Sequence, residues 1–212
     1  MIQVKTFVFN PFQENTYVVY NESRECLIFD PGCYFKEEQE KLIGFISEHQ
    51  LKPTCIVHTH GHVDHALGVN VIKDRFKIEA VMHADDLEVL RRSSDFGANI
   101  GIEVDQPSDP ERFIQEGETL QLGNAVFEVI HVPGHSPGSV AMLNKEDKIV
   151  FVGDVLFKQG IGRTDLMGGD FDTLLASIRK KLFTLDEKVV VYPGHGEPTT
   201  IGEEKRENPF VN

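Results

Sequence analysis

Apolar and polar positions alternate along the chain in a way that divides it into two halves of similar order. In the first half, β-branched and aromatic runs between turn formers indicate strands, and apolar residues at helical spacing indicate helices. Strands are predicted over residues 4–9, 16–20, 26–29, 55–57 and 79–82, and helices over residues 36–50, 66–76 and 85–91.

The second half repeats this order after a polar segment. Residues 93–111 are rich in Ser, Asp, Gly and Pro and predict a long loop, a kind of segment that is usually functional or mobile. Strands are then predicted over residues 119–122, 125–131, 139–144, 148–152 and 189–192, and helices over residues 170–182 and 202–207. Each half runs from strands through a helix to a strand that ends in a His-bearing loop. We therefore expect two αβ layers packed face to face in one domain spanning residues 1–212.

Composition limits the class of protein. A chain of 212 residues with 40% hydrophobic residues can bury a sizeable core. No stretch approaches the roughly 20 apolar residues of a membrane span, and the N-terminus lacks the pattern of a signal peptide. We therefore expect a cytoplasmic protein with no membrane partner. Cys26, Cys33 and Cys55 form no even disulfide framework, so we expect reduced thiols in or near the core.

The formal net charge of −13 argues against a general nucleic-acid binder, because such a chain repels phosphate backbones. The expected partner is a small molecule, and the sequence leaves the oligomeric state open.

The strongest chemical signal is the segment His60-Gly61-His62-Val63-Asp64-His65. Just after a strand, residues i and i+2 point to one side, so His60 and His62 can share one ion. Gly61 lets the backbone turn sharply between them, and Asp64 and His65 lie beyond the bend, within reach of a second ion. Imidazole suits zinc, and carboxylate oxygens also serve it.

Three further candidates follow runs that should be central strands. His135 lies in the segment 133–138, Asp154 follows the apolar run 149–153, and His195 lies in the segment 193–196. Ligands at strand ends are held rigidly, as a catalytic metal requires. Each alone has an ordinary structural explanation, but together with the first cluster they predict a metal centre.

On these motifs the sequence resembles the metallo-β-lactamase superfamily over nearly its whole length, and within it the short form of glyoxalase II (hydroxyacylglutathione hydrolase). The superfamily motifs are Thr59–His65 and Gly134–Gly138. The segments that resemble glyoxalase II are residues 153–157, 160–165, 192–196 and 204–209. The resemblance implies an α/β fold, the four-layer αβ/βα sandwich.

The resemblance also implies roles for single residues. His60, His62 and His135 would hold one metal, Asp64, His65 and His195 the second, and Asp154 would bridge both. The expected cofactor is two Zn²⁺ per chain, with Fe or a mixed Fe/Zn pair as the alternative.

Two residues outside the ligand set also receive roles from the resemblance. Asp30 would orient a ligand from behind; the alternative is a turn-forming Asp before Pro31. Arg163 resembles a basic residue that contacts the thiol carrier; the alternative is a salt bridge to Asp165 or Asp170. The sequence stops near residue 212, without the C-terminal helical region that supplies further glutathione contacts, so the carrier stays open.

The leading hypothesis is hydrolysis of a small acyl-thioester such as S-lactoylglutathione by a metal-bridging hydroxide. A thiol with a pKa of about 8.5 departs as thiolate without a strong acid, and Asp64 is the only catalytic acid that the motifs offer. The alternative is a persulfide dioxygenase-like enzyme with one iron at His60, His135 and Asp154. Hydrolysis of β-lactams or lactones, nuclease activity and a purely structural metal centre are less favoured.

Four histidines outside the motifs have ordinary interpretations. His58 and His131 are expected to be packed or to support the ligands, His49 to lie on a helix, and His83 to end a strand from which it could approach the site.

The catalytic interpretation predicts that His60→Ala folds but loses turnover. Circular dichroism and an activity assay on the same preparation check this. A variant that fails to fold would instead support a structural metal.

Overall fold

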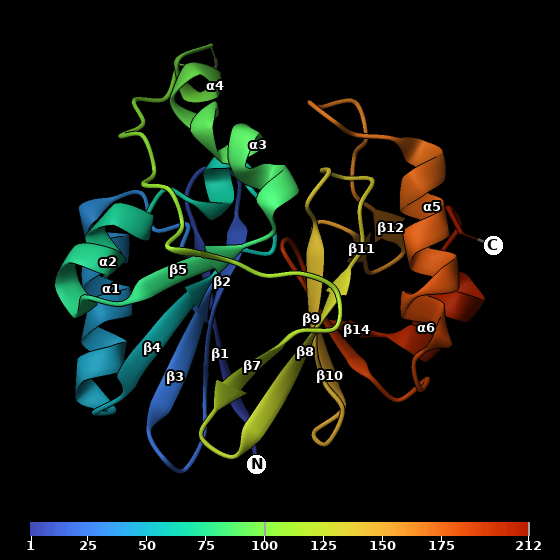
Figure 1. Cartoon of the computed structure of the whole chain (residues 1–212), viewed down its shortest axis with the longest axis horizontal. Coiled ribbons are helices and arrows are strands. Elements are labelled where there is room, and N and C mark those ends of the chain that lie inside the picture. The colour runs from blue at the N-terminus through green and yellow to red at the C-terminus, as the bar shows by residue number, and fades with distance from the viewer. Residues whose placement is uncertain (100, 212) are drawn as a thin grey trace.

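Two six-stranded sheets face each other, and helices cover their outer faces, which makes a four-layer α/β sandwich (Figure 1). The structure is a computed structural model that describes residues 1–99 and 101–211. The expected fold class is confirmed.

The first sheet has the order β1-β2-β3-β4-β5-β6. Its strands are β1 (Gln3–Phe9), β2 (Glu14–Tyr20), β3 (Glu25–Phe29), β4 (Lys52–Val57), β5 (Glu79–Met82) and β6 (Arg112–Phe113). The pairs among β1, β2 and β3 are antiparallel, and those from β3 to β6 are parallel. Helices α1 (Lys36–Glu48) and α2 (Val69–Phe76) cover its outer face, where Leu42 and Ile72 pack with Ile28 (Figure 1).

The second sheet has the order β14-β13-β10-β9-β8-β7. Its strands are β7 (Thr119–Leu122), β8 (Ala125–His131), β9 (Val140–Asn144), β10 (Ile149–Gly153), β13 (Val190–Pro193) and β14 (Thr199–Thr200). Helices α5 (Phe171–Lys180) and α6 (Ile201–Glu207) cover its outer face. Asp170 caps α5 by accepting a hydrogen bond from Thr173 N at 2.7 Å, and Leu174 and Ile178 face the sheet.

The main core lies between the sheets, because alternate residues of each strand point inward. In β3, Leu27 and Phe29 join this inner core, whereas Cys26 and Ile28 face the helices. Phe29 stacks on Phe151 of the second sheet with ring centroids 4.4 Å apart. Burying a side chain of this size stabilises the fold by about 1.5–3 kcal/mol.

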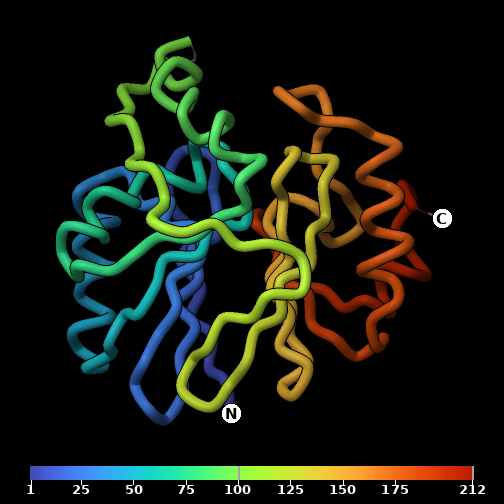
Figure 2. Tube along the Cα trace, viewed as in Figure 1, coloured from blue at the N-terminus to red at the C-terminus, as the bar shows by residue number. Residues whose placement is uncertain are grey.

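The segment between the halves differs from the prediction of a long loop. Residues 87–91 form α3 (Leu87–Arg91), as expected, but α4 (Ser93–Asn99) follows it within the predicted loop. Its composition favours turns, and its stability comes from packing: a Cβ on Gly97 would lie 2.4 Å from Val104 Cγ2 of the returning chain. Residue 100 lies outside the described residues. The chain then passes from β6 to β7 across one side of the sandwich (Figure 2).

Other differences are small. Pro53 lies inside β4, and α2 begins at Val69 because Gly68 N instead donates to Pro31 O at 2.7 Å. The two-residue strands β6, β11 (Leu156–Phe157), β12 (Gly160–Ile161) and β14 were not predicted, since two residues carry no detectable period.

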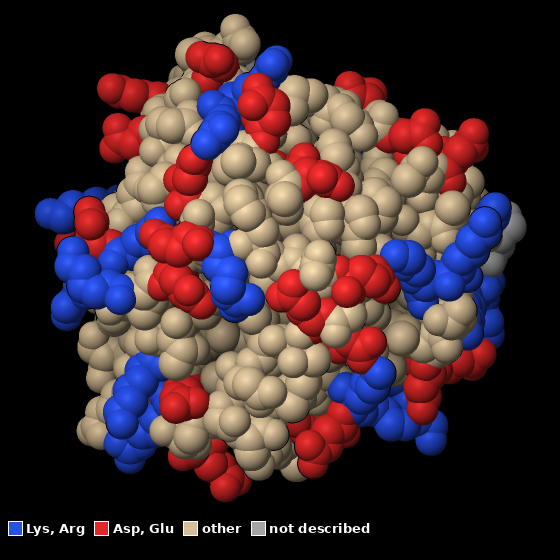
Figure 3. All heavy atoms as spheres, in the orientation of Figure 1, with Lys and Arg blue, Asp and Glu red and all other residues tan. Residues whose placement is uncertain are grey.

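The three cysteines are buried free thiols, as expected. Burial raises the pKa of each to about 12. None of the helices in residues 1–99 and 101–211 has the length and hydropathy needed to cross a membrane. Acidic and basic side chains are interspersed over the face shown in Figure 3.

Candidate metal centre

All seven predicted ligands meet at one edge of the sandwich. The segment 60–65 follows β4, His135 lies between β8 and β9, Asp154 follows β10, and His195 follows β13. Strands β10 and β13 are parallel, so their carboxyl ends reach the same edge. A hydrogen bond of 2.7 Å from Gly194 N to Gly153 O joins the loops that follow them.

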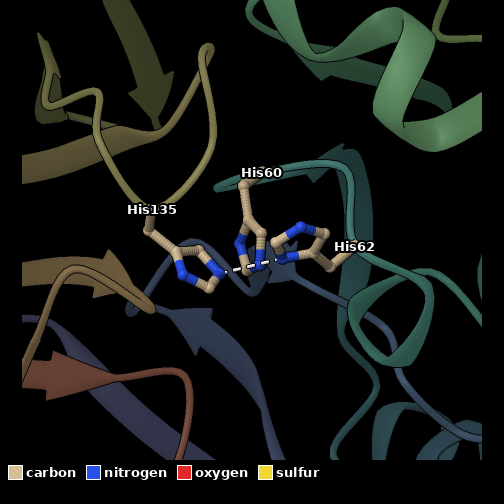
Figure 4. Close-up of side chains that lie close together, drawn as sticks. All are labelled: His60, His62 and His135. Carbon is tan, nitrogen blue, oxygen red and sulfur yellow. Dashed lines mark hydrogen bonds between the residues drawn. The ribbon is translucent and has the colours of Figure 1, made fainter. Parts of the chain in front are cut away.

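Three imidazoles form a first group, which we call trio 1: His60, His62 and His135 (Figure 4). His62 Nδ1 and His135 Nε2 lie 2.8 Å apart, and their ring centroids lie 4.6 Å apart. His60 Nε2 is buried and has no hydrogen-bond partner. Two of these rings come from one loop and the third from the facing half of the sandwich.

Trio 2 consists of Asp64, His65 and His195. His195 Nε2 lies 3.1 Å from Asp64 Oδ2, and His65 Nε2 lies 3.6 Å from the same oxygen.

Asp154 lies between the two groups. Its Oδ1 is 3.5 Å from His65 Nε2 of trio 2, and its Oδ2 is 3.7 Å from His135 Nε2 of trio 1. One carboxylate thus faces both groups.

The opposite nitrogens of three rings are held by acceptors. His135 Nδ1 donates to Arg163 O at 2.8 Å, His195 Nδ1 to Phe12 O at 3.1 Å, and His65 Nδ1 to Asp30 at 3.2 Å. Because these oxygens only accept, each Nδ1 carries a proton and each Nε2 faces the centre. Histidines that bind metals are oriented in this way.

Asp30 lies behind the centre, where the resemblance put it. Its Oδ1 accepts from Thr59 N at 2.7 Å, and its Oδ2 accepts from Thr59 Oγ1 at 2.6 Å and from His65. Its backbone φ of 44° is in the left-handed region, so it also turns the chain. Asp30 thus contacts His65 and also turns the chain, and its role in orienting a metal ligand stays a prediction.

The unpartnered buried atoms support a cation at this place. Four such atoms belong to the cluster: His60 Nε2, His62 Nε2, His65 Nε2 and Asp154 Oδ1. A buried polar atom without a partner costs about 1–3 kcal/mol, so such atoms are rare in folded proteins. Five imidazoles and two carboxylates form a donor set that suits zinc or iron.

The charge state of trio 1 also suits a metal. Burial, and next the charges of the other histidines, lower the pKa of His60 well below its usual range, and burial lowers that of His62 to about 3. Both rings are therefore neutral at pH 7, with lone pairs free. In trio 2, burial also acts to lower the pKa of His65, but the charges of Asp64 and Asp154 outweigh burial, so the pKa of His65 is raised.

A cavity of about 500 Å³ opens above the centre. Its floor includes members of both trios, and its walls come from α3 and α4 on one side and from residues 163–167 on the other. The apolar wall residues are Phe12, Val89, Phe96, Leu166 and Met167. Arg163 lines the cavity and also pairs with Asp165 through bonds of 2.6 and 2.8 Å, whereas Asp170 only caps α5.

The other histidines lie apart from both trios. His58 is fully buried, and burial lowers its pKa to about 4. His83 does not approach the centre as suggested: it stacks on His131 with ring centroids 4.1 Å apart. His49 ends α1 and packs on Phe45.

Two asparagines near the centre were not predicted. Asn10 Nδ2 donates to Asp64 O at 2.9 Å, and Asn15 Nδ2 donates to Pro193 O at 3.0 Å. They hold the backbone on either side of trio 2. No periodicity or motif marks them in the sequence, because isolated asparagines are common in turns.

Comparisons with known proteins identify the family and the fold of this chain. The sequence profile described as the Metallo-beta-lactamase superfamily matches residues 9–195. A protein of Haemophilus influenzae named hydroxyacylglutathione hydrolase GloC is 39% identical, covering 95% of this chain and 94% of its own. The crystal structure of BLEG-1 B3 metallo-beta-lactamase matches with a TM-score of 0.92 at 39% identity, over 99% of this chain and 100% of the other. That of TTHA1623 in a di-iron-bound form matches with a TM-score of 0.89 at 36% identity, over 98% and 100%.

Gly194→Ala should disrupt the centre without unfolding the chain. The added Cβ would lie 2.1 Å from Asp154 Oδ1 and 2.6 Å from His65 Cε1, so both side chains must shift. We expect a roughly 10–100-fold loss of metal affinity, measured by competition with a chromophoric chelator. The matched control is Gly44→Ala, since nothing lies within 4 Å of a Cβ there. Metal binding by Gly194→Ala equal to that of the control would contradict this account.

Proposed function

Because the chain belongs to the metallo-beta-lactamase superfamily, whose matching region includes all seven converging residues, we propose that it hydrolyses small acyl-thioesters at a dinuclear metal centre. The observation that carries the proposal is the pair of trios that share Asp154 at the floor of one cavity. At the coarser level the chain is a metal-dependent hydrolase.

We assign trio 1 to one metal, trio 2 to the other and Asp154 to both, with zinc as the proposed metal. A di-iron relative makes iron, or a mixed pair, the alternative. When bound, such a pair supplies a hydroxide at neutral pH and polarises the substrate carbonyl.

The side chains that line the cavity favour a thioester over an amide. Apart from the trios and Asp154, the titratable groups among the described lining residues are Arg92, Asp95 and Arg163. An arginine stays protonated, and Asp95 is exposed, so neither type delivers a proton to a leaving amine. A thiolate leaves without that proton. Asp64, whose side chain is 15% exposed at the cavity floor, is the proposed catalytic carboxylate. As a metal ligand it would be ionised, so it adds no proton donor for a leaving amine.

The cavity walls suit the two ends of such a substrate. Phe96 and Met167 are 39% and 40% exposed, and an acyl group in the cavity would cover them. Arg163 stands at the rim, where it could exchange Asp165 for a carboxylate of the thiol carrier. S-Lactoylglutathione is one candidate with both features.

An iron persulfide dioxygenase is the second candidate, using His60, His135 and Asp154. The distance of 3.7 Å between His135 Nε2 and Asp154 Oδ2 is compatible with it. That reaction would leave trio 2 without a role, although His195 and Asp64 are oriented toward the same centre. The dinuclear hydrolase therefore gives a role to all seven converging side chains.

The proposal predicts thioester turnover that depends on two metal ions. The zinc-loaded chain should hydrolyse S-lactoylglutathione, with thiol release followed by a colorimetric reagent, and a chelator should abolish the reaction. His49→Ala, outside the centre, serves as the control. Oxygen uptake on a persulfide by a form with one iron, together with no thioester cleavage, would reject the hydrolase.

Arg163→Ala should raise KM for thioesters of anionic carriers by roughly tenfold, because a charge-assisted hydrogen bond is lost, and leave kcat nearly unchanged. Thioesters of uncharged N-acetylcysteamine should show little change. Lys145→Ala, an exposed lysine paired with Glu128, is the matched control. An equal effect on both carriers would remove Arg163 from carrier recognition.

A further inference from the structure

Asp86 is a fully buried carboxylate that belongs to neither ligand loop. It ends the 3₁₀ turn Ala84–Asp86 between β5 and α3. Its Oδ2 accepts hydrogen bonds from Gly61 N and from Ser136 Oγ, each at 2.7 Å, and its Oδ1 accepts one from Gly138 N. Both carboxylate oxygens thus accept hydrogen bonds from other groups of the chain.

The three donors come from the two loops that carry all of trio 1. Gly61 lies between His60 and His62, and Ser136 follows His135 directly. One carboxylate therefore joins the first half of the sandwich to the second at the point where the three imidazoles converge.

The approach of both loops to Asp86 is close enough to require glycine. A Cβ on Gly61 would lie 2.7 Å from Asp86 O, and a Cβ on Gly138 would lie 2.6 Å from Asp86 N. At both glycines the backbone itself touches Asp86. The position of Asp86 therefore fixes the position of each loop backbone.

A hydroxyl chain extends the contact. Ser136 Oγ donates its proton to Asp86, so Ser139 Oγ, 2.7 Å away, donates to Ser136. Ser139 Oγ in turn accepts from Ser136 N at 3.3 Å. Asp86 accepts from three donors, which are Gly61 N, Ser136 Oγ and Gly138 N. An asparagine at position 86 would turn an N–H toward one of them, so only a carboxylate accepts from all three.

Trio 2 has a different support. Asp30 binds Thr59 and His65, and Asn10 holds the backbone of Asp64. Asp30 also reaches trio 1, because Thr59 Oγ1, which donates to it, lies 3.0 Å from His60 Nδ1. Among the described residues, the carboxylate of Asp86, by contrast, bonds only to the two loops that carry trio 1.

We propose that Asp86 is a positioning residue for the metal site of trio 1, because it fixes His60 and His62 relative to His135. This inference rests on the proposed metal centre. Loss of the carboxylate should weaken one metal site and spare the other.

The test is the Asp86→Asn variant, loaded with Co²⁺ or Zn²⁺ and compared with Asp74→Asn, an exposed aspartate on α2. Metal per chain after dialysis should fall from two to about one. The affinity of the weaker site, measured by competition with a chelator, should drop roughly 10–100-fold. The Co²⁺ absorption spectrum should match that of His62→Ala, which lacks a trio 1 ligand, and differ from that of His195→Ala.

The outcomes that would count against the inference are distinguishable from those that would count against its premise. Wild-type protein that binds no metal would reject the proposed centre itself. Two metals bound by Asp86→Asn with wild-type affinity, or equal weakening of both sites, would reject the positioning role alone. If Asp86→Asn does not fold, Ser136→Ala, which removes one donor, should give a few-fold loss confined to the same site. No loss, or loss at both sites, would overturn the proposal.

Discussion

The structure depends on buried nitrogen and oxygen atoms that face a common centre, away from water. His60, His65 and Asp154 each direct a buried atom at the centre with no protein partner. Each such atom costs free energy that the fold must recover elsewhere. The carbonyl acceptors behind the rings, the carboxylate of Asp30 and the glycines where loops touch all keep these atoms in place. The two proposed cations would together give each of these atoms a partner.

The centre is also the place where the two halves of the chain meet. Four of the seven residues come from the segment 60–65 and three from the second half. Ions bound at the proposed centre would stabilise the packing of the two halves by mass action, because the unfolded chain lacks the site. Metal occupancy and the packing of the halves are therefore linked equilibria.

Much of this arrangement could be predicted from the sequence. Strands such as β5, β7 and β8 have strong periodicity and were predicted with the bounds observed. The ligands stand in short motifs, and strand ends bring them together. By contrast, α4 packs on Val104 of the chain that returns from it, and Asp86 bonds to segments far apart in the chain. Nothing in the residues near Asp86 indicates that its partners are Gly61 and Gly138, so only the folded structure reveals them.

The protonation of the three cysteines has a consequence for a reaction that releases thiols. With pKa values of about 12, Cys26, Cys33 and Cys55 carry almost no thiolate at neutral pH, and all three are buried. Exchange with a disulfide requires a thiolate that can be reached. Mixed disulfides between these cysteines and a small oxidised thiol are thus disfavoured.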